Sequence, residues 1–278
     1  MQKRRYGKDG ELLSIIGFAG IIVKDEKQDD ADRFAAEAID RGVNYFDVAP
    51  SYGDAEIKLG HAIRGKRDKL FLACKTAERT SEGSEKELRE SFHRLKTDYF
   101  DLYQIHAVAS LDDVDVITGP GGCLETFVKA KEQGYIRHIG FSAHSEEAAE
   151  ALMDMFDFDS VLFPYNWVNI HTSGFGKRIY TKAIAKNITR LALKAMALTV
   201  WGEEEREYPK CWYKPVADPE LADLALRFTL SADFVSAVTP SHMELFRLAA
   251  DIADDFRPLD KEEMRKIKEE SIRYKPIF

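Results

Sequence analysis

Short apolar segments alternate with amphipathic segments of helical period along almost the whole chain. The apolar segments have the length of buried strands and lie at residues 14–23, 43–49, 70–75, 99–107, 136–143, 160–165, 190–197 and 234–239. The amphipathic segments between them predict helices at residues 29–41, 55–64, 84–95, 124–133, 145–156, 178–186 and 218–230. Such alternation is typical of a parallel sheet covered by helices. Eight strand candidates in 278 residues fit an α/β fold of the (β/α)8 TIM-barrel type, whose usual length is about 250 residues.

Both ends of the sequence carry additions to the eight repeats. Turn-forming residues between two segments able to pair, at residues 4–13, predict an N-terminal hairpin over the bottom of the barrel. Gly42 and Gly134 follow helical segments and predict helix-to-strand turns. After the last strand, residues 241–256 and 261–271 predict extra C-terminal helices. Because no linker or shift in composition divides the sequence, we expect one barrel domain over residues 1–278.

Composition and charge narrow the class of protein. Hydrophobic residues make up 45% and charged residues 32% of the sequence, which is typical of a folded, soluble protein. The net charge of −8 provides no basic surface for nucleic acid. No apolar segment approaches the about 20 residues that span a bilayer. We therefore expect a cytoplasmic protein with neither a nucleic-acid nor a membrane partner, of unknown oligomeric state.

The three cysteines, Cys74, Cys123 and Cys211, lie far apart in the sequence. They form no CxxC pair, and no histidine stands at metal-ligand spacing from them. Because free cysteine packs as a small buried hydrophobe, we expect three plain thiols and no metal site.

Ionisable residues gather where three successive predicted strands end. Asp47 ends the second strand and Tyr52 follows it, Lys75 ends the third strand, and His106 ends the fourth. The carboxyl ends of the strands form one face of a parallel barrel, and catalytic groups gather on that face. Each residue alone has an ordinary explanation, as a helix cap, a solvated charge or a packing residue. Their joint appearance on neighbouring strands favours a catalytic site.

These residues lie in a sequence that resembles a known family. Residues 42–53 read GVNYFDVAPSYG, which is similar to the signature of the aldo-keto reductases, including the spacing from Asp47 to Tyr52. The likeness continues through four short motifs and weakens in the last third of the chain. The four motifs are Leu59-Gly60, Lys75-Thr76, Gln104-Ile105-His106 and Gly140-Phe141-Ser142. The chain thus resembles a divergent, bacterial-type aldo-keto reductase.

The resemblance implies an NAD(P)H-dependent oxidoreductase that reduces aldehyde or ketone carbonyls to alcohols, or runs the reverse reaction on a small-molecule substrate. Tyr52 would be the general acid or base. A phenol with its ordinary pKa of about 10 is a weak acid near neutrality, so Lys75 would stabilise its phenolate. Asp47 would hold the Lys75 ammonium, and His106 would orient the carbonyl by a hydrogen bond.

The expected cofactor is NADP, with NAD as the alternative. No GxGxxG follows the first strand, so a Rossmann site is disfavoured, and the resemblance implies an extended dinucleotide across the barrel mouth. Small residues at the end of the first strand favour close approach of a cofactor ring. Ser241 stands at the start of a helix, either as an anion-binding group or as an N-cap. The residues expected to bind the cofactor are Gly17, Ser142, Leu193, Lys194, Ser241 and Arg247.

Two positions depart from the family pattern. Ala143 and Leu162 stand where the family places an amide pair that holds the nicotinamide carboxamide. Each lost hydrogen bond is worth roughly 0.5–1.5 kcal/mol. We therefore expect weak cofactor binding or a substitute donor, with Asn166, Ser142 and bound water as the candidates.

The substrate is not identified by the sequence. Four aromatic residues lie in loops after the sixth and seventh strands, where they either line an apolar pocket or pack the loops: Trp167, Trp201, Trp212 and Tyr213. Two other functions stay open: a nucleotide-binding regulatory subunit with little or no activity, and a Schiff-base lyase that uses Lys75 or Lys194 as its nucleophile.

Overall fold

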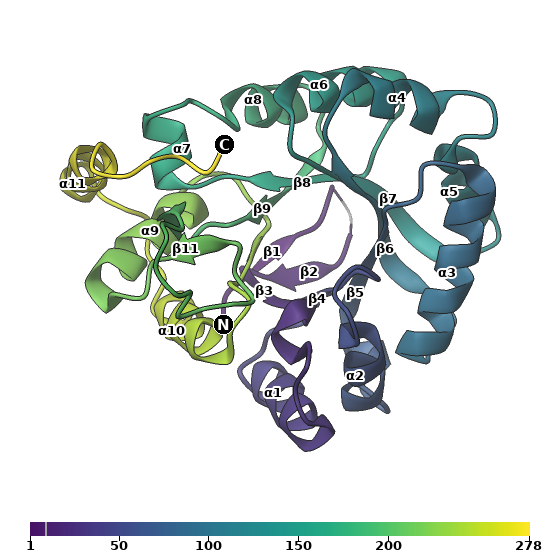
Figure 1. The fold of residues 1–278 in the computed structure, drawn as a ribbon, viewed down its shortest axis with the longest axis horizontal. Coiled ribbons are helices and arrows are strands. Elements are labelled where there is room, and N and C mark those ends of the chain that lie inside the picture. Colours follow the sequence, from purple (N-terminus) through teal and green to yellow (C-terminus); the bar gives the residue numbers. More distant parts are fainter. Residues whose placement is uncertain (9) are drawn as a thin grey trace.

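Eight parallel strands close a barrel in the order β12-β3-β4-β5-β6-β7-β8-β9. The computed structural model describes residues 1–8 and 10–278. The barrel strands are β3 (Ile16–Ala19), β4 (Tyr45–Asp47), β5 (Phe71–Thr76), β6 (Phe100–Val108), β7 (Ile136–Ala143), β8 (Ser160–Pro164), β9 (Thr189–Leu193) and β12 (Ser236–Val238). Figure 1 shows helices arranged in a ring outside these strands. The predicted (β/α)8 barrel is confirmed.

A helix covers the barrel after each strand. These helices are α1 (Gln28–Asp40), α2 (Ala55–Ala62), α3 (Ser81–Leu95), α5 (Cys123–Glu132), α6 (Glu146–Met155), α8 (Lys177–Ala185), α9 (Pro219–Ser231) and α10 (Met243–Asp254). A further helix, α11 (Lys261–Ser271), follows α10. Gly42 and Gly134 have φ of +83° and +77°, as their predicted place after a helix requires.

The sequence did not reveal the elements in the longer loops. They are α4 (Leu111–Thr118), α7 (Trp167–His171), the 3-10 helices η1 (Gly20–Val23) and η2 (Arg67–Lys69), and an antiparallel ribbon of β10 (Ala197–Val200) and β11 (Tyr213–Pro215). The first and seventh strands were predicted too long, because η1 and the turn at Lys194 are apolar continuations of true strands. Periodicity alone does not separate such short segments from a strand.

An N-terminal hairpin closes the amino end of the barrel. Strand β1 (Lys3–Arg5) pairs antiparallel with β2 (Leu12–Ser14), and Figure 1 shows both across the centre of the ring of strands. The Arg4 guanidinium donates hydrogen bonds to the carbonyls of Leu230 (2.7 Å) and Phe234 (2.6 Å), just ahead of β12. The hairpin therefore lies where the sequence predicted it, and Asp9 lies outside the described residues.

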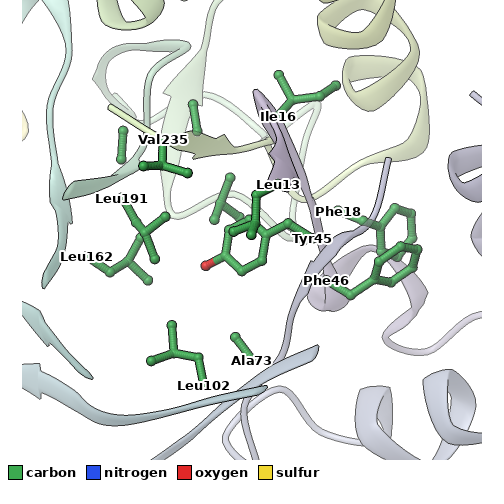
Figure 2. Packing of buried hydrophobic residues seen from close by; sticks show 14 of the residues in the cluster. Leu13, Ile16, Phe18, Tyr45, Phe46, Ala73, Leu102, Leu162, Leu191 and Val235 are labelled. Atoms are coloured by element: carbon green, nitrogen blue, oxygen red, sulfur yellow. The ribbon is translucent and has the colours of Figure 1, made fainter. Parts of the chain in front are cut away.

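The barrel interior is filled by side chains. Leu13 of the hairpin is fully buried there with Leu102, Leu162 and Leu191, around the ring of Tyr45 (Figure 2). A Cβ at Gly17 would lie 2.5 Å from the Tyr45 ring, so the glycine makes room for this ring. With the amino end plugged and the middle packed, the open face is at the carboxyl ends of the strands.

Three further observations bear on the expected class of protein. Within residues 1–8 and 10–278, no helix has the length and apolar character needed to cross a bilayer. All three cysteines are buried, unpaired thiols. The same residues contain no group of three histidine, cysteine or acidic side chains that could hold a metal ion.

A substitution at Gly60 tests how closely α2 packs against the end of α3. A Cβ at this position would lie 2.5 Å from the carbonyl oxygen of Arg94 and 2.7 Å from the Cα of Leu95. Gly60→Ala gains helix propensity but overpacks a rigid backbone, which typically costs about 1–3 kcal/mol. We expect a net loss of at least about 1 kcal/mol in the free energy of unfolding, measured with urea.

Ile57→Ala on the same helix is the matched control. Ile57 is 52% exposed, so its truncation should change the free energy of unfolding by no more than about 0.5 kcal/mol. Equal stability of Gly60→Ala and the wild type would show that α2 moves away from α3 at little cost.

Candidate active site

The structure brings Asp47, Tyr52, Lys75 and His106 together at the carboxyl ends of β4, β5 and β6. All four line one cavity, here called the mouth cavity. Its other lining residues are Ala19, Ile21, Ser142, His144, Leu193, Lys194, Lys210, Trp212, Tyr213, Val238, Thr239 and Ser241. The convergence expected from the strand ends is therefore present in the fold.

Asp47 and Lys75 form a buried ion pair at the floor of the mouth cavity. The exposed fraction of each side chain is 2% and 1%, and the Lys75 Nζ contacts Asp47 Oδ1 directly. Burial by itself would lower the pKa of Lys75, but the Asp47 carboxylate and the Tyr52 phenol outweigh burial and raise it. Lys75 therefore stays an ammonium at neutral pH, which disfavours it as a Schiff-base nucleophile.

The second carboxylate oxygen of Asp47 is held by two groups that the sequence reasoning missed. Asp47 Oδ2 accepts hydrogen bonds from the Tyr45 hydroxyl (3.0 Å) and from Gln104 Nε2 (3.1 Å). Tyr45 stands two residues before Asp47, and Gln104 two residues before His106. Side chains two apart on a strand share a face, so this spacing was the signal that could have identified both residues.

Tyr52 lies beside the ion pair and faces His106. The Lys75 Nζ is 5.8 Å from the centre of the Tyr52 ring, and the Tyr52 and His106 rings meet edge to face with centroids 6.1 Å apart. Burial raises the pKa of Tyr52, and the Lys75 ammonium opposes this without reversing it. Tyr52 is thus a protonated phenol at neutral pH, the form that a proton donor requires.

His106 projects into the cavity from an irregular part of β6. The register of β6 against β7 shifts between Ile105 and Val108, and Ala107 has a φ of +54°. Ala107 N donates a hydrogen bond to Ser142 Oγ (2.7 Å), so Ser142 supports this bulge. Burial, followed by the positive charge of Lys75, lowers the pKa of His106 to about 3. The imidazole is therefore neutral.

Four of the six residues expected to bind the cofactor line the mouth cavity, and two do not. Gly17 faces the Tyr45 ring in the barrel interior, and β3 contributes Ala19 to the cavity instead. Arg247 on α10 makes two 2.8 Å hydrogen bonds to the Glu37 carboxylate on α1, away from the cavity. In this structure neighbouring elements occupy both residues, so their contact with the cofactor stays a prediction that the cavity lining does not support.

Ser241 lies on the cavity wall but does not cap a helix. The N-cap of α10 is His242, whose side chain makes no cap hydrogen bond. The N-cap interpretation of Ser241 was therefore wrong, and its hydroxyl stands just ahead of the helix.

Ala143 and Leu162, the two positions where the family resemblance implies an amide pair for the nicotinamide carboxamide, lie in different environments. Leu162 packs in the barrel interior with Leu102 and Leu191 (Figure 2) and is absent from the described lining of the mouth cavity. Ala143 is the buried last residue of β7. Asn166 Oδ1 accepts a hydrogen bond from Asn169 N (2.9 Å), while its Nδ2 is buried without a partner among the described residues. Of the suggested substitutes, the Asn166 amide nitrogen is thus still unengaged.

One of the three tryptophans reaches the cavity. Trp212 lines it and is 48% exposed. Trp167 is fully buried against Tyr274, with ring centroids 5.5 Å apart. Trp201 donates a hydrogen bond from Nε1 to the Cys211 carbonyl (2.8 Å). Of the two roles expected for these residues, Trp167 and Trp201 therefore show the packing role, in the fold and in the loop.

The loop between β10 and β11 supplies Lys210, a cavity residue to which the sequence reasoning gave no role. Lys210 Nζ contacts Glu26 Oε1 (2.6 Å) and the Ile22 carbonyl (2.9 Å) in the segment after β3, which is two strands away from β9 in the barrel. Tyr213, one of the four aromatic residues expected either to line a pocket or to pack the loops, also lines the cavity. His144, which follows β7, lines it as well and was missed by the sequence reasoning. The place of Lys210 in the cavity depends on the contact of this loop with the segment after β3, for which the sequence carries no local signal.

A substitution at Tyr45 tests how much its hydrogen bond to the Asp47 carboxylate contributes to stability. Tyr45→Phe removes one hydrogen bond to a buried carboxylate, and bonds to charged groups are worth about 1.5–3 kcal/mol. We expect the free energy of unfolding in urea to fall by that amount. Tyr103→Phe is the matched control, because the buried Tyr103 hydroxyl has no partner within the described part of the chain. A similar loss in both variants would mean that the Tyr45 hydroxyl contributes nothing specific to Asp47.

Comparisons with known proteins agree with this geometry. Similar curated proteins include the Uncharacterized oxidoreductase YqkF of Bacillus subtilis (strain 168), 34% identical over 157 residues that cover 51% of this chain and 49% of the relative. The Aldo-keto reductase YhdN of the same strain is 32% identical over 143 residues, covering 46% of this chain and 41% of the relative. The chain thus spans about half the length, or less, of these relatives.

Solved structures extend the likeness to the whole fold. The holo form of the aldo-keto reductase AKR11C1 from Bacillus halodurans superposes with a TM-score of 0.75 and 22% identity, covering 97% of this chain and 96% of that chain. At this identity the likeness shows the fold alone. The model of the Aldo/keto reductase family matches residues 22–211, which is more than half of the sequence. The chain therefore belongs to the aldo/keto reductase family.

Proposed function

We propose that this protein is an NADP(H)-dependent oxidoreductase, with NAD(H) as the alternative cofactor, that reduces aldehyde or ketone carbonyls or oxidises the corresponding alcohols. The supporting observation is the Tyr52 phenol, which lies in the mouth cavity beside the buried Asp47–Lys75 ion pair. The proposed substrate is a small molecule, and the proposed functional unit is one barrel domain over residues 1–278.

The lining of the mouth cavity fits a nicotinamide dinucleotide in its chemistry. Apolar side chains of Ala19, Leu193 and Val238 offer a surface for a flat ring. Lys210 and Ser241 on the same wall offer a cation and a hydroxyl for phosphate groups. When bound, the dinucleotide supplies the hydride that carbonyl reduction requires.

The other steps of the reaction are assigned to four cavity residues, here called the tetrad: Asp47, Tyr52, Lys75 and His106. Neutral His106 donates a hydrogen bond to the substrate carbonyl without giving up its proton, because its pKa of about 3 keeps a single N–H. Tyr52 donates its proton to the alkoxide that develops on the carbonyl oxygen. The Lys75 ammonium stabilises the phenolate that remains, and Asp47 holds this ammonium in place. In the reverse direction the phenolate accepts the alcohol proton.

The protonation state of His106 can be measured directly. Its pKa of about 3 lies below the ordinary value, so the neutral form should persist at every pH well above 3. We expect the His106 ring nitrogens to keep neutral-imidazole chemical shifts from about pH 5 to 8 in heteronuclear NMR spectra, where an unperturbed histidine titrates. His106→Asn identifies the signals by their loss. Titration of those signals near pH 6.5 would contradict the proposed neutral donor.

The role of Tyr52 is tested by separating binding from turnover. Tyr52→Phe removes the proton donor and keeps the ring, so the reduction rate should fall by about 10²–10⁴-fold. Dinucleotide affinity, measured by fluorescence titration, should stay within a factor of about 2. Tyr135→Phe is the control, because Tyr135 is 44% exposed and lies outside the cavity lining. Undiminished turnover by Tyr52→Phe excludes Tyr52 as the acid.

A further inference from the structure

A second buried lysine lies in the mouth cavity without a carboxylate partner. Lys194 follows β9 and is only 7% exposed. None of the ion pairs among residues 1–8 and 10–278 includes it. Its Nζ lies 3.1 Å from His144 Nε2, and 4.8 Å and 4.7 Å from the ring centres of Trp212 and Phe278. The amine is thus enclosed by a neutral imidazole and two aromatic rings.

Comparison with Lys75 shows what Lys194 lacks. Both side chains are almost fully buried, and burial disfavours the charged form of each. The Asp47 carboxylate compensates at Lys75 and raises its pKa, whereas nothing compensates at Lys194, whose pKa burial lowers to about 7. An anion beside Lys194 Nζ would supply the missing compensation.

Lys194, which lines the cavity, also has an unusual backbone conformation. Lys194 has a φ of +62°, a left-handed conformation that is uncommon for residues with a Cβ. The turn is closed by a 2.9 Å hydrogen bond from Ala197 N to the Lys194 carbonyl, which separates β9 from β10. Such strained residues are enriched at ligand sites.

Lys194 lies on the side of the cavity near His106, and not on the side of Ser241, which we propose for phosphate. His144 follows β7, which is two strands away from β9 and is the neighbour of β6 with its His106. The positive charge of Lys194 is also among the causes that lower the pKa of His106. Ser241 and Thr239 instead follow β12, on the other side of β9. An anion at Lys194 would therefore lie beside the substrate carbonyl.

We propose that Lys194, together with His144, binds a carboxylate of the substrate, so that the preferred substrates are small aldehydes or ketones that carry a carboxylate. This rests on the proposed function, because it assumes that the carbonyl lies between Tyr52 and His106. The Trp212 and Phe278 rings keep the ammonium in place by cation–π contacts and exclude water from it. Trp212 also offers an apolar face to the carbon chain of the substrate.

Matched substrates test the selectivity. We expect the wild type to reduce 4-carboxybenzaldehyde with a kcat/KM about 10–100-fold higher than that for 4-formylbenzamide, as one charge-assisted hydrogen bond predicts. Lys194→Met, of similar length and without charge, should lower kcat/KM for the acid by that factor and for the amide far less. Lys194→Arg should keep part of the preference. Lys69→Met, at an exposed lysine outside the cavity, is the control and should keep all of it.

A binding experiment separates this inference from the proposed function. Calorimetric titration should show benzoate binding at least about 10-fold more tightly than benzamide to the wild type, and this difference should disappear in Lys194→Met. Such a result without turnover of either aldehyde would refute the reductase proposal and support the carboxylate site. Turnover of both aldehydes with no preference for the acid would support the reductase proposal and refute the carboxylate site.

Two results would overturn the inference by assigning Lys194 another role. In the first, Lys194→Met weakens binding of the nicotinamide dinucleotide and leaves benzoate binding unchanged, which places Lys194 on the cofactor phosphates. In the second, borohydride treatment with 4-carboxybenzaldehyde links the aldehyde to Lys194, detected by mass spectrometry. The amine would then be a Schiff-base nucleophile.

Discussion

The buried Asp47–Lys75 ion pair is the interaction around which the catalytic face is built. Two charges removed from water are stable only when the remaining lone pairs and protons find partners. The strands meet this requirement through their register, because Lys75 pairs with Gln104 across β5 and β6, and Gln104 reaches back to Asp47. Tyr45 provides the other hydrogen bond to Asp47 Oδ2. Gly17 on β3 leaves room for the Tyr45 ring, so the support of one carboxylate extends over four strands.

The two buried lysines of the mouth cavity differ in pKa because their neighbours differ in charge. Lys75 has a fixed counterion and keeps its charge in the free protein, which suits its proposed role of stabilising a Tyr52 phenolate. Lys194 has aromatic and imidazole neighbours, which hold it in place without neutralising it. The first lysine has its counterion within the fold, whereas we propose that a ligand supplies the counterion of the second. Such a difference between two similar side chains arises entirely from their surroundings.

The mouth cavity is made by elements that are distant in sequence. Lys210 in the loop before β11 contacts Glu26 and the Ile22 carbonyl near the start of the chain, so this loop lies against the segment after β3. The loop also brings Trp212 beside Lys194. In a (β/α)8 barrel the strands supply the rigid positions and the loops supply the variable walls. The tetrad of this chain lies on the strands and the turn after β4, whereas much of the wall around Lys194 comes from loops.

The sequence by itself determined the barrel and the location of the tetrad. Alternating periods of two and 3.6 residues specify strands and helices locally, and parallel strands must bring the ends that carry Asp47, Lys75 and His106 to one face. Only the tertiary structure decided which other residues reach the cavity. Arg247 is held by Glu37, Trp167 is buried against Tyr274, and Gly17 faces Tyr45, whereas His144, Lys210 and Tyr213 line the cavity. Each of these outcomes depends on a partner supplied by another element of the fold, and periodicity and spacing along the chain carry no information about that partner.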